Sequence, residues 1–268
     1  MFKRAVKIIR INKKEKSEIE DVVVIESPID LFINSESLVN IICLPKDLKE
    51  LAVGFLFSIG FINSIDDIKQ INIDEMENKL YIDIDDSINF KLEKLKLNPV
   101  SRVIDTTCGI SSPWRDIMKT SLVNLKESKK TNNEFQIKTE LIHQGIVEMQ
   151  RETLLFRETG GCHGAAIFNS EGSLLTLKED IGRHNAIDKV IGDMLIQKRS
   201  LDHVFLTTTG RLTGDSVLKA VRARIPIVAS LSAAIESGIR LAFAYGITLI
   251  GFARGSKMNI YSHPERII

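Results

Sequence analysis

Short runs of β-branched and aromatic residues dominate the beginning of the chain. The runs VVVIE, IDLFI and LVNIICL lie between Val22 and Leu44, and they are interrupted by Pro28 and by the turn-forming residues NSES. Runs of this length, separated by turn-forming residues, are typical of β-strands. The pattern predicts a meander of strands over this segment.

A helical pattern follows the meander. Asp47 stands at an N-cap position, Gly60 follows as the expected C-cap, and the apolar residues between them recur at helical spacing. Residues 68–97 then show two or three strand patterns, with turns near MENK and DDS, and the regular pattern ends at Pro99. The first part therefore predicts a small α+β domain. The apolar positions of its helix are Leu48, Leu51, Ala52, Phe55, Leu56 and Ile59.

The second half of the chain alternates helix and strand patterns. A helical pattern from Trp114 to Leu125 is followed by KESKKTNNE, which has the polar composition of a linker. After an amphipathic helix over about 138–158, the strands AAIF and LLTLKE form a hairpin around NSEG, and three helix–strand repeats follow. This order predicts a three-layer α/β/α domain with a mainly parallel sheet. The three repeats are helix 182–198 with HVFLTT, helix 214–224 with IVASL, and helix 234–245 with ITLIGFA.

These patterns divide the chain into two expected domains. The small α+β domain covers residues 1–128 and ends in an irregular loop at about 99–113 and a helix, and the α/β/α domain covers residues 129–268. A chain of 268 residues exceeds the usual size of one domain, which agrees with this division.

The composition limits the classes of function. Hydrophobic residues make up 44% and charged residues 26%, as in an ordinary soluble protein. No apolar run approaches the ~18–20 residues that span a bilayer, and the start MFKRAVKIIRINKKEK lacks the features of a signal peptide. The net charge of +1 gives no overall field for nucleic acid or membranes, so we expect neither partner. Three cysteines, an odd number, indicate a reducing compartment, so we expect a cytoplasmic protein.

Four glycine-containing loops fall at the predicted carboxyl ends of strands. They are ETGGCHGA at 158–165, EDIGRHNAIDK at 179–189, TTTGRLTGD at 207–215 and GFARGSK at 251–257. Ligands bind at this edge of such sheets, where glycine permits close approach, helix N-termini offer N–H groups and arginine matches phosphate. One Gly-Arg pair at a helix start is commonly only a cap with a solvated charge. Four similar loops together predict an anion or nucleotide site.

Polar residues gather around His184, which lies in the first turn of the predicted helix 182–198. Dense clusters of titratable groups at the end of a sheet are typical of functional sites, although a histidine here could also be a packed side chain. His163 belongs to another loop of the same edge, and both ligand contact and a structural role remain open for it. The polar residues around His184 are Glu179, Asp180, Asn185, Asp188 and Lys189.

Metal binding is a separate hypothesis, because Cys162 and His163 are adjacent and Cys108 could approach them. The sequence has no Cys-x-x-Cys and no His-x₃₋₅-His pair, and neighbouring residues of an extended segment point to opposite sides. The helix order of the second domain resembles the cytidine deaminase-like fold, in which zinc ligands lie at the starts of the second and third helices. These places hold RHN at 183–185 and TGR at 209–211, with no PCxxC and no HAE. We therefore expect no zinc and no other metal.

Six segments form a set of family motifs. They are ESPIDLF at 26–32, LKELAVGFLFSIGFI at 48–62, TGGCHGA at 159–165, EDIGRHNAIDK at 179–189, GRLTGD at 210–215 and GFARGSKMNIYSHPER at 251–266. This set resembles the formate dehydrogenase accessory proteins of the FdhD type over nearly the whole chain. The resemblance implies a homodimeric sulfur carrier with a deaminase-like second domain. Such a carrier takes persulfide sulfur from a cysteine desulfurase. It passes the sulfur to the molybdenum bis-molybdopterin guanine dinucleotide cofactor before the cofactor enters formate dehydrogenase.

The resemblance implies that the four loops bind the guanine dinucleotide part of this cofactor. Arg183, Arg211 and Arg254 are expected near its phosphates, where helix N-terminal N–H groups and Gly255 would complete the site. The expected cofactor-binding residues are Gly161, His163, Glu179, Asp180, Gly182, Arg183, His184, Asn185, Asp188, Lys189, Gly210, Arg211, Phe252, Ala253, Arg254, Gly255, Ser256 and Lys257.

The irregular stretch DTTCGISSP gains a role from the same resemblance. Family members carry a cysteine pair in a mobile loop between the two domains. Its first member corresponds to Cys108, and Ser111 stands in place of the second. A carrier needs an exposed thiolate, and Arg102 or Arg115 could lower the pKa of this thiol. Because serine cannot accept a persulfide, we expect Cys108 to be the catalytic residue on its own. Cys162 is either a second sulfur station or a packed side chain.

Two alternative functions agree with some of these sequence features. A cofactor-binding chaperone for the guanine dinucleotide cofactor would use the four loops without needing Cys108 for sulfur transfer. A metal-free nucleotide-modifying enzyme is the third possibility, and only the analogy of fold supports it.

Overall fold

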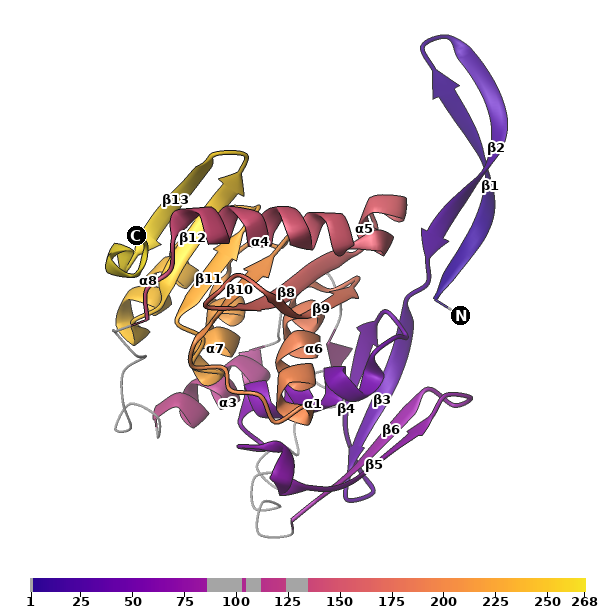
Figure 1. The fold of residues 1–268 in the computed structure, drawn as a ribbon. Coiled ribbons are helices and arrows are strands. Elements are labelled where there is room, and N and C mark those ends of the chain that lie inside the picture. Colours follow the sequence, from indigo (N-terminus) through magenta and orange to yellow (C-terminus); the bar gives the residue numbers. More distant parts are fainter. Residues whose placement is uncertain (1, 86–102, 105–111, 124–134) are drawn as a thin grey trace.

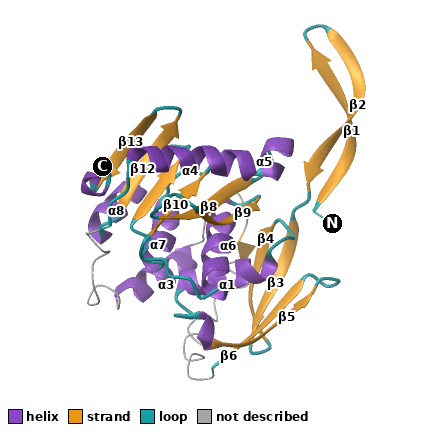
Figure 2. Ribbon diagram, viewed as in Figure 1, coloured by secondary structure: helices purple, strands orange, loops and turns teal. Residues whose placement is uncertain are grey.

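The structure is a computed structural model that describes residues 2–85, 103–104, 112–123 and 135–268. The described residues form a two-stranded ribbon, a five-stranded sheet and a six-stranded sheet, with helices packed against the sheets (Figures 1 and 2). The two larger sheets belong to the body of the molecule, and the ribbon stands away from it (Figure 1).

The five-stranded sheet has the order β5-β6-β3-β4-β7. β3 and β4 form an antiparallel hairpin, whereas β6 lies parallel to β3 and β7 lies parallel to β4. Alternate residues of β3, namely Ile29, Leu31 and Ile33, are buried in one core with helix α1, as expected for a strand with one covered face. The elements of this unit are β3 (Ser27–Ile33), β4 (Glu36–Cys43), α1 (Leu48–Ile59), the 3₁₀ turn η1 (Ile65–Asp67), β5 (Ile68–Asp74), β6 (Lys79–Ile84), β7 (Val103–Ile104) and α3 (Ser112–Val123).

The ribbon consists of β1 (Lys3–Asn12) and β2 (Glu15–Val24), which pair antiparallel along their whole length. It extends far from the body in Figure 1. Ile9 and Ile11 are each 62% exposed on it. At its base, Lys3 Nζ binds the carboxylate of Glu158 at 2.9 Å. The sequence pattern predicted strands only from Val22 onward, so this ribbon was missed.

The six-stranded sheet has the order β13-β12-β11-β10-β8-β9. The predicted mainly parallel sheet is wrong, because two neighbouring pairs are parallel (β10–β11 and β11–β12) and three are antiparallel (β8–β9, β8–β10 and β12–β13). The antiparallel pairs arise because β9 and β13 return by short turns, and because the helix after β9 leads to a strand beside β8. The elements are α4 (Thr139–Glu152), α5 (Leu154–Thr159), β8 (His163–Asn169), β9 (Leu174–Asp180), α6 (Arg183–Ile196), β10 (Val204–Thr208), α7 (Gly214–Arg222), β11 (Ile227–Ser230), α8 (Glu236–Tyr245), β12 (Thr248–Arg254), β13 (Lys257–Ser262) and the 3₁₀ turn η4 (Pro264–Arg266).

Helices cover both faces of this sheet. Alternation along β8 separates the faces, since Ala166 and Phe168 pack with α4, whereas Ala165 and Ile167 belong to the core that contains α6, α7 and α1. In Figure 1, α4 runs across one face, and α6 and α7 lie on the other. The described residues therefore form the expected three layers.

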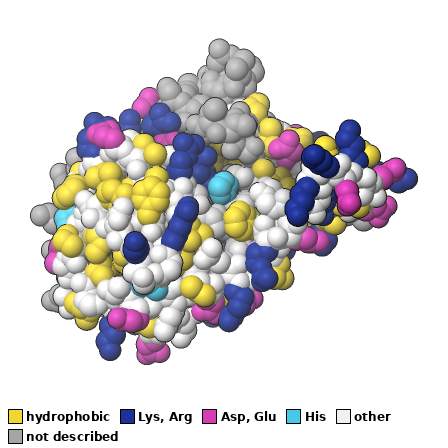
Figure 3. Space-filling model, turned by 90° about the horizontal axis from the view of Figure 1, so that it is seen from above, with side chains coloured by type: hydrophobic (Ala, Val, Ile, Leu, Met, Phe, Trp, Pro, Cys, Tyr) yellow, Lys and Arg dark blue, Asp and Glu magenta, His cyan; other side chains and the backbone are white. Residues whose placement is uncertain are grey.

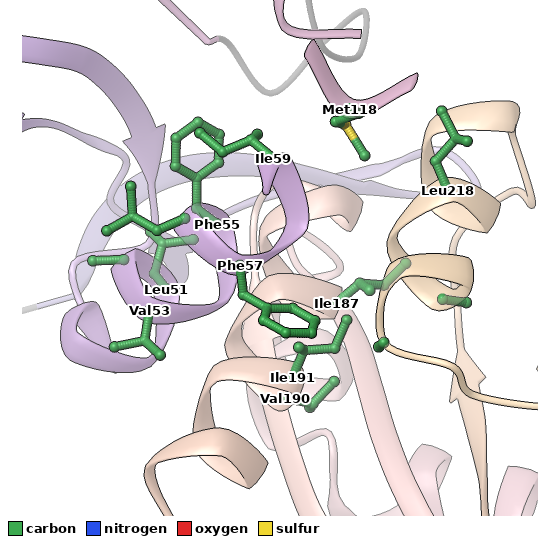
Figure 4. Close-up of a cluster of buried hydrophobic side chains, with 14 of the residues drawn as sticks. Leu51, Val53, Phe55, Phe57, Ile59, Met118, Ile187, Val190, Ile191 and Leu218 are labelled. Atoms are coloured by element: carbon green, nitrogen blue, oxygen red, sulfur yellow. The ribbon is translucent and has the colours of Figure 1, made fainter. Parts of the chain in front are cut away.

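Helix α1 of the first unit packs closely against α6 of the second. A Cβ atom at Gly54 would lie 1.8 Å from the carbonyl oxygen of Asp188, and one at Gly192 would lie 2.0 Å from that of Glu50. Phe57 of α1 lies against Ile187, Val190 and Ile191 of α6 (Figure 4). One hydrophobic core thus extends through both units. The expected domain boundary between residues 128 and 129 lies outside the described residues.

The expected helices are present, with small differences at their ends. Asp47 is the N-cap residue of α1, as predicted, but it does not cap the helix with its side chain. Its backbone is left-handed (φ 54°), and Lys178 Nζ donates to its side chain at 3.1 Å. The C-cap at Gly60 is confirmed. The predicted helix 138–158 is divided at Thr153 into α4 and α5.

Candidate functional site

The four glycine-containing loops lie at one edge of the six-stranded sheet. Three of them follow the carboxyl ends of strands, as predicted, but loop 158–165 lies at the amino end of β8, because β8 runs antiparallel to β10. β8 begins at His163, which lies opposite Asp180 at the end of β9. β10 ends at Thr208, which pairs with Ser230 at the end of β11. Arg254 ends β12, whose axis lies two strand spacings, about 10 Å, from that of β10. The structure thus brings all four glycine-containing loops to the same edge. Seen from above, Lys and Arg side chains lie beside a histidine near the middle of the molecule (Figure 3).

His184 lies in the first turn of α6 and is only 8% exposed. Its Nδ1 atom is 3.5 Å from Ser216 Oγ in the first turn of α7. Its Nε2 atom is buried and has no hydrogen-bond partner among the described residues. Burial, together with the positive charges of Lys219 and Arg183, lowers the pKa of His184 well below its ordinary value of 6.5. The imidazole is therefore neutral at physiological pH.

His163 occupies the neighbouring loop and is half-buried. Its Nδ1 atom lies 3.0 Å from Thr209 Oγ1, which also accepts a hydrogen bond from Gly164 N at 3.1 Å. Burial lowers the pKa of His163, and the charges of Arg183 and Arg211 lower it further. His163 is thus a second neutral imidazole at the same edge.

The three expected arginines lie in three different loops. Gly210 allows two of the loops to touch, because a Cβ atom there would be 2.7 Å from Cβ of Arg183. Arg211 follows Gly210 and is exposed, as is Gly161 in the first loop. Arg254 is held at the end of β12, where its Nε donates to the carbonyl oxygen of Leu231 at 2.7 Å.

The turn between β12 and β13 has an unusual backbone. Phe252 has a φ of 52° and is 44% exposed, and Gly255 has a φ of 57°. A non-glycine residue at positive φ is uncommon, and such strain gathers at functional sites. Ser256 and Lys257 are exposed beside them, whereas Ala253 is fully buried and packs with α4. Ala253 therefore serves the core, and the exposed side chains of this turn are available to a ligand.

Glu179 is buried and caps a short helix. Its carboxylate accepts hydrogen bonds from the backbone N–H groups of Leu155 at 3.1 Å and Phe156 at 2.7 Å, which are the first residues of α5 after Leu154. Carboxylates stabilise helix N-termini in this way. The geometry accounts for Glu179 as a structural residue, and its expected contact with a cofactor stays a prediction.

Asp180, Asn185 and Lys189 join the two units of the body. Lys189 Nζ is 2.7 Å from the carboxylate of Asp180, and both side chains are fully buried. Asp180 also accepts hydrogen bonds from Asn185 Nδ2, from the N–H of Gly182, which is the N-cap of α6, and from the N–H of Leu44 after β4. These side chains hold β4 against the start of α6, and ligand contact through them stays a prediction.

A second buried ion pair connects α6 with α7. Lys219 Nζ lies 2.6 Å from the carboxylate of Asp188, which also accepts a hydrogen bond from Ser58 Oγ of α1 at 2.6 Å. Lys219 was not among the predicted site residues, although a lysine inside the apolar run SVLKAV was a signal of burial. A buried charge pair needs such complete partnering to be tolerated.

Arg115 attaches α3 to α7. Its Nε and a terminal nitrogen lie 2.7 and 3.1 Å from the two carboxylate oxygens of Asp215. This bidentate geometry is the strongest form of an arginine–carboxylate pair. The sequence indicated Arg115 only as a possible neighbour of Cys108, and nothing in it indicated Asp215 as the partner.

The two described cysteines are buried. Cys162 is 3% exposed and packs against Leu44 and Leu155. Burial, followed by the nearby charge of Glu179, raises the pKa of Cys162 to about 12. Burial likewise raises the pKa of Cys43. Both thiols stay protonated at physiological pH, and a protonated thiol is a poor nucleophile. Cys108 and its neighbour Ser111 lie outside the described residues.

The described residues contain no group of three or more histidine, cysteine, aspartate or glutamate side chains placed to hold a metal ion. None of the helices in the described ranges is both long and apolar enough to cross a membrane.

Comparison with known proteins gives one consistent family. The sequence model of the FdhD/NarQ family matches residues 24–268. The chain is 36% identical to the sulfur carrier protein FdhD of Sulfolobus acidocaldarius over 267 residues, which cover 98% of each chain. It is 34% identical to the protein of the same name from Bacillus subtilis, over 96% of this chain and 95% of that one.

A solved structure agrees with these relatives. The crystal structure of a formate dehydrogenase accessory protein from Desulfotalea psychrophila superposes with a TM-score of 0.79 and 28% identity, and the match covers 100% of both chains. With its motifs, its α/β fold and its relatives in agreement over nearly the full length, the chain belongs to the FdhD/NarQ family.

Proposed function

We propose that this protein is a sulfur carrier in the maturation of formate dehydrogenase. Its thiolate at Cys108 attacks the outer sulfur of a persulfide on a cysteine desulfurase. A new S–S bond forms on Cys108, and the donor cysteine leaves as a thiolate. The outer sulfur then passes to the molybdenum bis-molybdopterin guanine dinucleotide cofactor, which is bound as a substrate and provides the electron pair of the new bond. The S–S bond on Cys108 breaks, and Cys108 is released as a thiolate. The names of the curated relatives support the carrier role.

The observation that carries this proposal is the burial of the other two cysteines. The chain has three cysteines. Cys43 and Cys162 are buried thiols of raised pKa, so neither can present a thiolate to a large donor protein. Cys108 is the cysteine that remains for the carrier role, in agreement with its place in the motif DTTCGISSP.

The attachment of α3 supports a path from Cys108 to the cofactor. α3 begins at Ser112, four residues after Cys108, and four extended residues reach at most about 14 Å. The pair between Arg115 and Asp215 holds the first turn of α3 against α7, whose own first turn contains Ser216 next to His184. The first turn of α3 is thereby held close to the edge where the four loops meet.

The exposed residues of the four loops fit the guanine dinucleotide part of the cofactor. Arg183, Arg211 and Arg254 supply charge that suits phosphate groups. The buried Nε2 atom of His184 has no hydrogen-bond partner among the described residues, which supports a polar group of the ligand at this position. When bound, the cofactor supplies the molybdenum that receives sulfur, while the protein orients its nucleotide part. We also propose that the three-layer unit has the cytidine deaminase-like arrangement and acts as the cofactor-binding domain.

The ribbon β1–β2 supports a homodimer. An isolated two-stranded ribbon is marginally stable in water, and this one exposes Ile9 and Ile11. β1 carries Lys3, Arg4, Lys7 and Arg10, whereas β2 carries Glu15, Glu18, Glu20 and Asp21. These charges pair within the ribbon, as Lys7 does with Glu18 and Arg10 with Asp21, so the exposed apolar side chains are the part that a second copy would cover.

Intact-mass measurement after incubation with a cysteine desulfurase and cysteine tests the carrier role directly. The parent protein should gain the mass of sulfur, and peptide mapping should place it on Cys108. The matched variants Cys43→Ala and Cys162→Ala should load equally, whereas Cys108→Ala should neither load nor activate formate dehydrogenase. Activation by Cys108→Ala at the parent level would overturn the proposal and leave the cofactor-binding chaperone in its place.

A further inference from the structure

We infer that His184 donates a hydrogen bond from Nε2–H to a phosphate group of the bound ligand. His184 then acts as an uncharged phosphate-recognition residue at the N-terminus of α6. This inference deepens the proposed function and rests on it, because it assigns one contact and one tautomer within the proposed nucleotide site.

The first argument is the isolation of the Nε2 atom. Buried side-chain nitrogens nearly always have a hydrogen-bond partner, because leaving one without a partner costs about 1–3 kcal/mol. His184 is more than nine-tenths buried, and Nε2 has no such partner among the described residues. Asn185 and Asp188, two polar side chains in the same helix turns, have hydrogen-bond partners inside the protein. Since no described residue partners Nε2 of His184, we assign its partner to the ligand.

The second argument concerns the proton on the imidazole ring. Nδ1 lies 3.5 Å from Ser216 Oγ, which is also 3.2 Å from Thr213 Oγ1. If the Thr213 hydroxyl donates to Ser216 Oγ, the Ser216 hydroxyl proton is left to donate to Nδ1. The ring proton then resides on Nε2, and we assign this tautomer. A neutral imidazole with its proton on Nε2 can only donate at that atom.

The third argument is the charge around the ring. A positive charge on His184 is disfavoured by burial and by four nearby groups, namely Lys219, Arg183, His163 and Arg115. The anionic groups on the packed elements are already engaged, Asp188 with Lys219 and Asp215 with Arg115. In addition, no side chain of the described residues caps the N-terminus of α6, where backbone N–H groups attract anions. An anionic acceptor is therefore favoured over a neutral one, and phosphate is the anion that the proposed ligand carries.

Three probes separate the phosphate contact from contacts to the base or sugar. Binding of GDP, guanosine and inorganic pyrophosphate is measured by calorimetry to the full-length parent protein and to two variants. His184→Met keeps the volume but removes the donor, and His184→Gln places an amide N–H near the position of Nε2. His184→Met should weaken GDP and pyrophosphate binding roughly tenfold or more, as expected for a hydrogen bond to a charged group. It should leave guanosine binding unchanged, and His184→Gln should recover most of the loss.

Matched controls show that the effect belongs to this ring. His203→Met changes an exposed histidine that precedes β10, at the opposite edge of the sheet, and it should bind all three probes as the parent does. Thermal unfolding of each variant confirms that it is folded. In the ¹⁵N spectrum of histidine-labelled protein, the His184 ring should show a protonated Nε2 and a bare Nδ1. GDP should shift the Nε2 signal, a readout that a purely structural histidine would not give.

The outcomes separate this inference from the proposed function. Equal affinity of parent and folded His184→Met for pyrophosphate and GDP overturns the inference, as does a ring proton found on Nδ1. An equal loss for guanosine assigns His184 to the nucleoside and also overturns the phosphate contact. A parent protein that binds pyrophosphate through His184 but fails to load sulfur would refute the carrier function alone.

Discussion

At the scale of single residues, burial decides which motif residues can meet a ligand. Asp180, Asn185 and Lys189 belong to the most specific motif of the chain, yet their polar atoms bind one another and the residues around β4. Arg211 comes from the motif GRLTGD and Phe252 from the tail motif, and both are exposed at the sheet edge. Motif residues can therefore be of two kinds: buried residues that hold the elements around the site in place, and exposed residues that can contact a substrate.

Cys162 provides a test of this distinction. Replacing Cys162 by alanine should lower the free energy of unfolding by about 1–2 kcal/mol, because a buried sulfur atom is lost from a packed cluster. Persulfide loading and activation of formate dehydrogenase should persist. Urea unfolding and an activation assay measure the two effects separately. Loss of sulfur delivery, with Cys108 still loaded, would show instead that Cys162 is a second sulfur station.

The two neutral histidines make stability depend on pH. His163 and His184 have lowered pKa values in the folded protein, whereas both return toward 6.5 on unfolding. Below about pH 6.5 the unfolded chain therefore binds more protons, and the free energy of unfolding should fall as the pH falls, by at most about 1.4 kcal/mol per unit per histidine. Denaturant titrations between pH 7.5 and about 5.5 measure this slope. The variant with both His163→Gln and His184→Gln should show a smaller slope, and an unchanged slope would contradict the assignment.

At the scale of elements, the contact between α1 and α6 sets the relative position of the two units. The helices touch at Gly54 and Gly192, where hydrogen atoms replace side chains. Around these points, the apolar side chains of both helices fill a common core (Figure 4). The same contact places β4, through Leu44, against the start of α6. The geometry of the candidate site therefore depends on an interface between distant parts of the sequence.

Gly54→Ala should be strongly destabilising, by at least about 3 kcal/mol, because its Cβ would lie 1.8 Å from a backbone carbonyl oxygen that cannot rotate away. Gly214→Ala is the matched control. Its Cβ would meet only side-chain atoms at 3.3 Å, so a small effect is expected. Equilibrium unfolding of both variants measures the difference. Similar stability of the two variants would mean that the helices are not in this close contact.

At the scale of the whole molecule, a compact body carries one projecting ribbon. The body has a core that passes through both units, whereas the ribbon contributes little to it and exposes apolar side chains (Figure 1). A monomer gains little from such a ribbon. This contrast is the reason to expect a contact between molecules at β1 and β2.

Changing Ile9 and Ile11 to aspartate should weaken self-association, because two charges would be placed on the proposed dimer surface. Sedimentation velocity should show a dimer for the parent and a shift toward monomer for the variant. Glu171→Lys, in the exposed turn between β8 and β9, is a control for added or altered charge and should stay dimeric. A parent protein that sediments as a monomer, or a variant that remains fully dimeric, would contradict the proposed interface.

Local pattern was sufficient to predict most of the elements of this fold. The helices α1, α6, α7 and α8 and most strands of the two larger sheets follow from periodicity and turn residues, because these depend on neighbours in the chain. The strands β7 and β13 were not predicted. The family motifs also indicated the four loops that meet at one edge of the six-stranded sheet. The ribbon β1–β2 escaped prediction because its alternating charged and apolar residues face water on both sides, so no buried face marked it.

Tertiary structure alone decided what each polar residue of the motifs does. Whether Asp180 meets a ligand or Lys189, and whether Asp47 caps a helix or binds Lys178, depends on which distant segments pack beside them. The antiparallel pairing of β8 with β10 likewise follows from the path of the chain rather than from its pattern. The burial of His184, whose Nε2 atom has no hydrogen-bond partner among the described residues, also results from the packing of distant segments. Desolvation and hydrogen bonding arise between segments far apart in sequence, so they become visible only in the folded molecule.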